Sequence, residues 1–278
     1  MTATEPLILG RIDYLNCRPL YEELEQLSGG YYKLVAGNPA ELNQRLEEGR
    51  IDVSPSSSIL PAVSPHDDYF ILSGIAIASL KEVRSVLLLS RREAKELKGC
   101  RISLTGHSLT SIFLLKIILT HCFGLRLEEL EFISGEFLPT TGNEAALVIG
   151  DRALELYHHP PTGYHIYDLG RLWHELTGLP FVYALWFGRR EAQERQTAKL
   201  ERLRNDLNRI CRRLPEKLET LSRHLGPQNG FTPPQLSSYW QDAISYRLDT
   251  EAQRGLELFY RLATELELIR TVPRLAIF

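Results

Sequence analysis

Hydroxyl-bearing side chains are concentrated in two short stretches of this 278-residue chain, and the sharper stretch is Thr105-Gly-His-Ser-Leu-Thr-Ser111. It lies between a predicted strand, residues 101–105, and a strongly apolar predicted helix, residues 108–122. A strand-to-helix turn of this kind combines hydroxyl groups with unpaired backbone N–H groups at a helix N-terminus, and it binds carboxylate or phosphate. The predicted anion-binding side chains are Ser108, Thr110 and Ser111. In the alternative interpretation Ser108 only caps the helix, and a charge contribution from His107 is the less favoured role for that histidine.

The second stretch is Ser54-Pro-Ser-Ser-Ser58, which directly follows a short predicted strand, residues 51–54. In open α/β sheets, ligands bind in the crevice at the carboxyl ends of the strands. Three hydroxyl groups are therefore predicted to bind substrate: Ser56, Ser57 and Ser58. The alternative is a polar turn without a ligand.

Asn16 and Ser85 are two further polar residues at the ends of predicted strands. Asn16 closes the strand predicted over residues 7–15, and its amide offers a donor and an acceptor without charge, which suits it to orient a hydroxyl group. The alternative is turn formation ahead of Pro19. Ser85 opens a strand predicted over residues 85–90, and it lies near a ligand cleft if that strand belongs to a hinge.

Asp151 follows the apolar strand predicted over residues 145–149. It would orient a ligand or act as a base, whereas a helix cap or a surface pair is the more ordinary role of an acid before Arg152. The eight histidines show no spacing with carboxylate or cysteine ligands that suits a metal. No dinucleotide-binding, P-loop or nucleophile-elbow motif occurs, so we expect no cofactor, no metal and no serine hydrolase chemistry.

The elements that position these residues follow an alternating pattern. Strands are predicted over residues 7–15, 31–36 and 51–54, with helices over 18–27 and 40–48 between them. Asn38 caps the second helix and Pro39 takes its first position. This βαβαβ order predicts a parallel sheet flanked by helices. Further strands are predicted over residues 70–78, 85–90, 101–105, 131–134, 145–149 and 181–187.

Two α/β units and a helical tail are the predicted organisation, since 278 residues exceed the usual size of one compact core. The second unit begins near residue 90, and residues 191–267 have an almost wholly helical pattern. The predicted lobes are residues 1–87 together with 188–278, and residues 88–187. Crossings near residues 87 and 187 would form a two-stranded hinge, with the tail packed on the first lobe.

Charge and composition exclude several classes of partner. The formal net charge of −3 gives no electrostatic case for nucleic acid or for an anionic membrane. No stretch reaches the about 18 apolar residues of a spanning helix, and residues 1–10 do not read as a signal peptide. Four scattered cysteines are typical of a reducing compartment. The prediction is a soluble cytoplasmic protein.

The stretch Gly10 to Leu20, Gly-Arg-Ile-Asp-Tyr-Leu-Asn-Cys-Arg-Pro-Leu, resembles the opening of chorismate dehydratases of the futalosine route to menaquinone. The resemblance covers about residues 7 to 190. Further matches run in the same order along the chain: Asp52-Val-Ser-Pro-Ser-Ser-Ser58, Ser85-Val-Leu-Leu-Leu-Ser90, Ser108-Leu-Thr-Ser111, Ala146-Leu-Val-Ile-Gly-Asp151, and Asp168-Leu-Gly170 through Trp173 to Thr177-Gly-Leu-Pro-Phe181. Each motif alone is weak, but six in register are specific.

This resemblance implies an α/β fold of the type II periplasmic-binding-protein kind, with two lobes and mixed sheets. It implies a carbon–oxygen lyase that dehydrates chorismate, a small dicarboxylate, to 3-[(1-carboxyvinyl)oxy]benzoate in a cleft between the lobes. The expected path is E1cB-like and substrate-assisted, with Asn16 and Ser85 orienting the reacting groups. The hydroxyl groups expected to hold carboxylate are those of Ser57, Ser58, Thr110 and Ser111.

The chain departs from the family pattern at several positions, and different functions stay open. The acidic residue often found soon after Ser58 is absent here, because Ile59, Leu60 and Pro61 follow. The sister enzyme 1,4-dihydroxy-6-naphthoate synthase carries a histidine base where this chain has Gly150. The remaining competing functions are a non-catalytic carboxylate-binding protein and the sensing domain of a regulator. The sequence assigns no oligomeric state.

Overall fold

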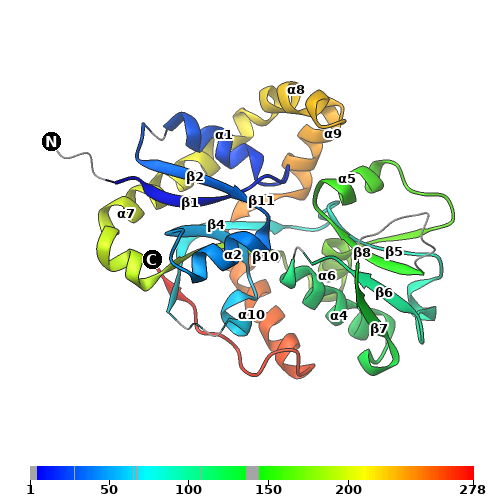
Figure 1. Ribbon diagram of the computed structural model, residues 1–278. Coiled ribbons are helices and arrows are strands. Elements are labelled where there is room, and N and C mark those ends of the chain that lie inside the picture. Colours follow the sequence, from blue (N-terminus) through cyan, green and yellow to red (C-terminus); the bar gives the residue numbers. More distant parts are fainter. Residues whose placement is uncertain (1–4, 28, 65, 67, 107, 136–143) are drawn as a thin grey trace. The chain divides into compact units, whose positions relative to one another are not determined.

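The computed structural model describes residues 5–27, 29–64, 66, 68–106, 108–135 and 144–278 (Figure 1). The chain divides into two compact units. Unit 1 comprises Met1–Ala78, Ala184–Asp249 and Pro273–Phe278, and unit 2 comprises Ser79–Tyr183 and Thr250–Val272. The chain thus passes from one unit to the other at four points. Residues 250–272, predicted above to belong to the first lobe, group with unit 2.

Unit 1 is built on a mixed sheet. Its strands are β1 (Leu7–Ile12), β2 (Tyr32–Gly37), β3 (Val53–Ser57), β4 (Tyr69–Ser79), β10 (Phe181–Arg189), β11 (Ser245–Arg247) and β12 (Ala276–Ile277). They lie in the order β11-β4-β10-β3-β1-β2, and β12 pairs with β4. Strand β1 is parallel to both β2 and β3, whereas β10 is antiparallel to β3. The first three strands therefore form the predicted βαβαβ unit.

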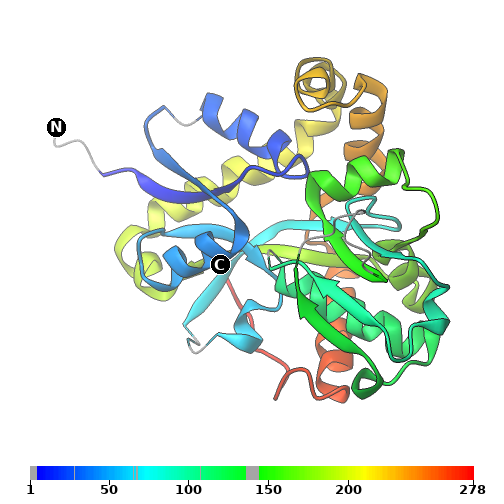
Figure 2. The same ribbon diagram turned by 45° about the vertical axis from the view of Figure 1, so that its right-hand side comes forward.

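Helices cover both faces of this sheet. They are α1 (Arg18–Leu27), α2 (Pro39–Glu47), α3 (Leu60–Val63), α7 (Arg190–Arg213), α8 (Leu218–Gln228) and α9 (Pro233–Ser238). Helices α1 and α7 run side by side (Figures 1 and 2). The predicted cap of α2 is confirmed, because Asn38 Oδ1 accepts a hydrogen bond from the Glu41 N–H at 2.9 Å.

The two faces can be told apart at the centre of the sheet. A Cβ at Gly10 would lie 2.2 Å from Ser54 Oγ and 3.4 Å from Leu42 of α2, so α2 covers the face that carries Ser54. Pro55 points to the other face because side chains alternate along a strand. Its ladder partner Trp186 contacts the Tyr21 ring of α1 at 5.9 Å between centroids, so α1 covers that other face.

The boundaries predicted for β3 are wrong. A strand over residues 51–54 with the serines directly after it was expected, but β3 spans Val53–Ser57 and all five residues are buried. Antiparallel pairing with β10, from Gly188↔Val53 to Ala184↔Ser57, extends the strand through the serines. Serine and proline have low strand propensity, so this pairing overrides the local preference.

Unit 2 contains a second mixed sheet. Its strands are β5 (Val86–Ser90), β6 (Arg101–Leu104), β7 (Glu131–Ser134), β8 (Ala145–Ile149) and β9 (His165–Asp168). Their order is β7-β6-β8-β5-β9. Strand β6 is parallel to β7 and β8, whereas β5 is antiparallel to β8 and β9. The helices of this unit are α4 (Leu109–Phe123), α5 (Gly150–His158), α6 (Leu169–Thr177) and α10 (Thr250–Glu265).

An aromatic cluster explains why α10 belongs to unit 2. The Trp173 ring of α6 contacts Phe181 at 5.1 Å and Phe259 of α10 at 6.4 Å between centroids. Helix α10 also approaches closely at Gly255, where a Cβ would lie 2.1 Å from the Pro180 carbonyl oxygen. The tail is therefore not purely helical, since β11 and β12 join unit 1, and its last long helix packs on unit 2.

Among the residues that the structure describes, no helix combines the length and apolar character needed to cross a membrane.

Candidate functional site

In unit 1, the loop that follows β1 is fixed by two aromatic side chains from the far end of the sequence. Trp240 Nε1 donates a hydrogen bond to the Leu15 carbonyl at 2.7 Å, and the Tyr246 hydroxyl donates to the Asn16 carbonyl at 2.8 Å. Burial raises the pKa of Tyr246 well above its ordinary value, so this hydroxyl stays protonated and keeps donating. The backbone of the loop is thereby held in one position.

The Asn16 side chain is left available by this arrangement. Its Oδ1 is buried and has no hydrogen-bond partner among the described residues. A buried amide oxygen without a partner costs free energy and needs an explanation, and a hydrogen-bond donor on a bound ligand would supply one. This geometry suits the predicted role of Asn16, which is to orient a hydroxyl group.

The serines of β3 lie at the same edge of the unit 1 sheet as Asn16. Because β1 and β3 are parallel neighbours, their carboxyl ends meet at one edge. Ser56 and Ser57 are strand residues that point to opposite faces, and Ser58 follows in the turn. All three are buried, and Ser56 Oγ has no partner within the described part of the chain. The sequence thus placed them at the right edge but in the wrong element.

In unit 2, the sheet topology brings together three of the predicted features. Strands β6 and β8 are parallel, so the loops before α4 and α5 leave the sheet at one edge. Strand β5 is antiparallel to β8 and begins at that edge. A direct contact confirms the proximity, because the Gly150 N–H donates to the Ser85 carbonyl at 2.8 Å. The α4 N-terminus, the α5 N-terminus and Ser85 therefore share one edge.

Ser108 is the N-cap of α4, as expected for a serine that opens a helix. Its Oγ accepts from the Ser111 N–H at 3.3 Å and lies 2.9 Å from Ser111 Oγ. Thr110 and Ser111 are buried in the first turn of the helix. His107 lies outside the described residues.

A stability measurement tests this cap. Ser108→Ala is expected to lower the free energy of unfolding by about 1 kcal/mol, because it leaves an N–H group of the first turn without an acceptor. Ser108→Gly also removes the hydroxyl but is expected to cost only roughly 0.3 kcal/mol, since glycine is tolerated at this position. Urea titration of the three proteins measures the difference, and equal losses would exclude a capping role.

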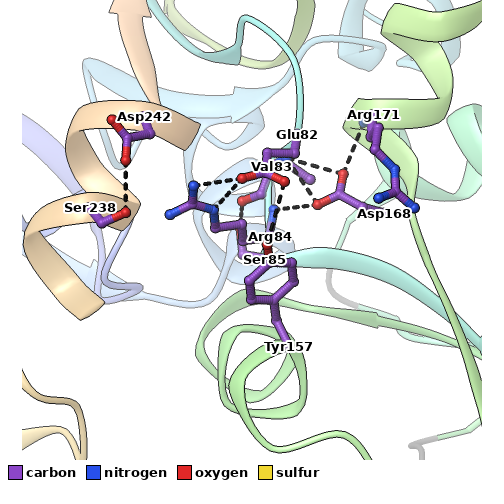
Figure 3. Close-up of polar contacts among 9 residues, drawn as sticks. All are labelled: Glu82, Val83, Arg84, Ser85, Tyr157, Asp168, Arg171, Ser238 and Asp242. Atoms are coloured by element: carbon purple, nitrogen blue, oxygen red, sulfur yellow. Dashed lines mark hydrogen bonds and ion pairs between the residues drawn. The ribbon is translucent and has the colours of Figure 1, made fainter. Parts of the chain in front are cut away.

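Ser85 is the last residue of a tight turn, residues 82–85, that is held by a buried carboxylate (Figure 3). Asp168 accepts hydrogen bonds from the backbone N–H groups of Val83 and Arg84, and it also caps α6. Burial raises the pKa of the Asp168 carboxyl above its ordinary value, and these backbone hydrogen bonds oppose the rise. The Ser85 hydroxyl itself donates to the Val83 carbonyl at 3.3 Å.

Asp151 lies in the first turn of α5, where a carboxylate interacts favourably with the helix dipole. Its neighbour Arg152 forms an ion pair with Glu155 at 2.5 Å. In the described part of the chain, no group of three or more histidine, cysteine or acidic residues is arranged to bind a metal ion.

A pocket of about 460 Å³ lies elsewhere in unit 1. It is lined by the start of β4, the first turns of α7 and β12, with Asp68, Arg190 and Glu194 as its charged residues. Because β10 is antiparallel to β3 and leads into α7, this pocket lies at the sheet edge opposite Ser57. It therefore includes none of the predicted site residues.

Sequence reasoning assigned no role to three residues that shape the two edges: Asp168, Trp240 and Tyr246. The sequence Asp168-Leu-Gly-Arg171 carried a usable signal, because an aspartate before a helical pattern is a typical N-cap. Trp240 and Tyr246 carried none, since their carbonyl partners lie 225 and 230 residues away.

Comparison with known proteins agrees with these observations. The family model described as "Menaquinone biosynthesis" matches residues 7–265. A chorismate dehydratase of Thermus thermophilus is 32% identical over 269 residues, which cover 91% of this chain and 94% of that protein.

Solved structures show the fold. An alkanesulfonate-binding protein of Xanthomonas axonopodis has a TM-score of 0.74 at 16% identity, and the match covers 100% of this chain and 99% of that one. A periplasmic aliphatic sulphonate binding protein of Escherichia coli has a TM-score of 0.68 at 14% identity, covering 98% and 96%. The α/β fold with two mixed sheets is thus of the periplasmic-binding-protein kind, as the resemblance implied, and the chain belongs to the menaquinone biosynthesis family that its chorismate dehydratase relative represents.

Proposed function

We propose that this protein removes water from chorismate to give 3-[(1-carboxyvinyl)oxy]benzoate, a step of menaquinone biosynthesis. The observation that carries the proposal is the 32% identity to a chorismate dehydratase over 91% of the chain. The polar groups described above at the two sheet edges suit a substrate with two carboxylates and a hydroxyl group. The cytoplasmic location expected from the sequence stays a prediction.

The chemistry of chorismate favours elimination through a carbanion. The proton at C3 is acidic because the carbanion left by its removal is conjugated with the ring carboxylate. Loss of the C4 hydroxyl group then makes the ring aromatic. Hydrogen-bond donors at the ring carboxylate stabilise the negative charge that spreads into it as the proton leaves. Donors positioned in advance for such developing charge often supply the largest part of a rate enhancement.

The proposed roles follow the residue types. Asn16 and Ser85 orient the reacting groups, and Asp151 orients the substrate. The substrate's own enolpyruvyl carboxylate takes the C3 proton and gives it to the departing C4 hydroxyl group, which leaves as water, so that no side chain has to serve as the base. The hydroxyl groups that bind carboxylate are those of Ser56, Ser57, Ser58, Ser108, Thr110 and Ser111.

The direct test is incubation of the purified protein with chorismate, followed by chromatography of the products. Conversion to the aromatic carboxyvinyl ether supports the proposal. Binding of chorismate without conversion would favour a non-catalytic carboxylate-binding protein. Inertness toward chorismate, together with 1,4-dihydroxy-6-naphthoate synthase activity, would identify the sister enzyme.

The role of Ser85 is tested on the same assay. Ser85→Ala is expected to lower kcat about 100-fold, which is the usual scale for losing one positioned polar group at the reacting centre. Ser90→Ala is the matched control, because Ser90 is also buried, at the other end of β5, and its Oγ accepts from the Arg92 N–H at 3.1 Å. Equal kcat values for the two variants would contradict the role of Ser85.

The capping variants separate two roles of Ser108. If its hydroxyl binds substrate as well as capping α4, Ser108→Gly raises KM although the helix stays nearly as stable. An unchanged KM in that variant would leave Ser108 with the capping role alone.

A further inference from the structure

We propose that Asp168 is a positioning residue for the dehydration: its carboxylate fixes the turn at residues 82–85 and thereby holds Ser85 in its reactive place. The inference rests on the proposed function, because it assumes that Ser85 contacts the substrate. It adds a residue that binds no substrate and acts only through the backbone.

The carboxylate of Asp168 is almost fully buried, at 4% exposure, and it collects backbone donors from two segments far apart in sequence. The Val83 N–H lies 3.1 Å from each oxygen, and the Arg84 N–H donates to Oδ2 at 2.7 Å. The Arg171 N–H in the first turn of α6 donates to Oδ1 at 3.0 Å. Hydrogen bonds to an ionised acceptor are about twice as strong as neutral ones, so Asp168 ties this turn firmly to α6.

The turn needs such support because its backbone is unusual. Arg84 has φ of 60°, in the left-handed region that residues other than glycine rarely adopt. Its guanidinium is also held, since Arg84 Nε donates to Glu82 Oε1 at 2.6 Å (Figure 3). A conformation of this kind persists only where the surroundings impose it, and the Asp168 carboxylate supplies two of the constraints.

Gly170 permits the close approach on which these contacts depend. A Cβ at this position would lie 2.8 Å from the Lys81 carbonyl oxygen and 2.9 Å from Ser79 Oγ. The start of α6 therefore lies directly against residues 79–81. Gly170 and Asp168 therefore act together: the missing side chain of Gly170 allows close packing, and the carboxylate of Asp168 accepts the hydrogen bonds.

Two hydrogen bonds of Ser85 make its position depend on the turn and on the start of α5. The Ser85 hydroxyl donates to the Val83 carbonyl, and the Ser85 carbonyl accepts from the first residue of α5 at 2.8 Å. If the Val83 and Arg84 N–H groups lose their acceptor, the hydroxyl of Ser85 moves with the backbone. Misplacement of a reacting group by about 1 Å can lower a rate about 100-fold.

Asp168→Asn is the informative substitution. Asparagine is as good an N-cap as aspartate, so the cap of α6 can be retained. With its amide oxygen in the place of Oδ1, asparagine keeps the hydrogen bonds from Arg171 and Val83, but its NH2 group takes the place of Oδ2 and removes the acceptor of the Arg84 N–H. We expect kcat to fall between about 10-fold and 100-fold with KM within about twofold of the wild type.

The matched control is Asp206→Asn in α7. Asp206 is also buried, at 8% exposure, but it accepts from the Tyr32 hydroxyl at 2.8 Å within unit 1. This variant should lose stability and keep its kcat. A fall in kcat of the same size in both variants would show that loss of any buried carboxylate suffices, and it would overturn the inference.

A double-mutant cycle tests whether Asp168 acts through Ser85. On the Ser85→Ala background, Asp168→Asn should lower kcat by less than about twofold, because the group it positions is already gone. Multiplicative losses would overturn the inference while the dehydratase activity of the wild type stands. If the wild type converts no chorismate, it is the proposed function that fails.

Hydrogen exchange gives a readout that needs no activity. In Asp168→Asn, the amide of Arg84, which bonds to Oδ2 alone, should exchange at least about tenfold faster than in the wild type. The Arg171 amide should change less, because the cap is kept. Unchanged exchange at Arg84 would show that Asp168 does not hold the turn.

Discussion

Replacing Asn16 by alanine is expected to lower kcat for chorismate dehydration between about 100-fold and 1,000-fold, the range found when one preorganised polar group is removed from an active site. The expected change in folding stability is small, because Asn16 Oδ1 makes no hydrogen bond to any described residue. The loop keeps its shape, since Trp240 and Tyr246 bind its backbone carbonyl groups rather than its side chains. Steady-state kinetics and a urea titration measure the two effects separately.

The control for Asn16→Ala is Asn43→Ala. Asn43 lies in α2, and its Oδ1 is likewise buried without a partner among the described residues. Both substitutions remove a side-chain amide whose buried oxygen has no partner among the described residues, so a functional role is what should distinguish them. Near-normal kcat in Asn16→Ala would contradict the proposed mechanism, and matching losses in both variants would point to a structural cause.

Replacing Trp173 by alanine is expected to lower the free energy of unfolding by about 3–5 kcal/mol, the usual cost of truncating a buried tryptophan. Trp173 is fully buried, and its Nε1 donates to the Pro180 carbonyl at 3.2 Å. The substitution opens a cavity among Phe181 and Phe259 and leaves the Pro180 carbonyl without this donor. Urea unfolding followed by circular dichroism measures the loss.

Leu176→Ala on the same helix is the control, because Leu176 is 38% exposed and its truncation should cost no more than about 0.5 kcal/mol. Similar losses for Trp173→Ala and Leu176→Ala would mean that the aromatic cluster does not carry the packing of α6 against α10. The comparison therefore also tests the assignment of α10 to unit 2.

Several elements follow from local sequence signals alone. The predicted bounds of α1 at residues 18–27, β7 at 131–134 and β8 at 145–149 agree with the structure. Residues close to the ends of such elements mark their boundaries locally, as Pro19 does at the start of α1. The cap of α2 by Asn38 was equally readable, because donor and acceptor lie three residues apart. The family resemblance was also local, since six short motifs in order were enough to establish it.

For the predicted site too, some features followed from local sequence signals and others did not. The pattern of strands placed Asn16 and the β3 serines at one sheet edge, and Ser85 and Ser108 at another, since parallel neighbours present their carboxyl ends together. The sequence offered Ser108 as a helix cap, but it did not show that Ser56 and Ser57 are strand residues or that Ser56 Oγ has no partner among the described residues. Ser57 joins β3 because Ala184 pairs with it, and that partner lies far along the chain.

By itself, the sequence determined most of the element types, the α/β class, the family and the residue types available for binding a dicarboxylate. Tertiary structure alone decided that residues 250–272 join unit 2, that the serine stretch is a strand, and that Asp168 holds the turn before Ser85. The physical reason is the separation along the chain between the residues that interact. Caps and periodicity act within one or two helical turns, whereas Asp168 and Val83 meet across 85 residues through a fold that no local pattern specifies.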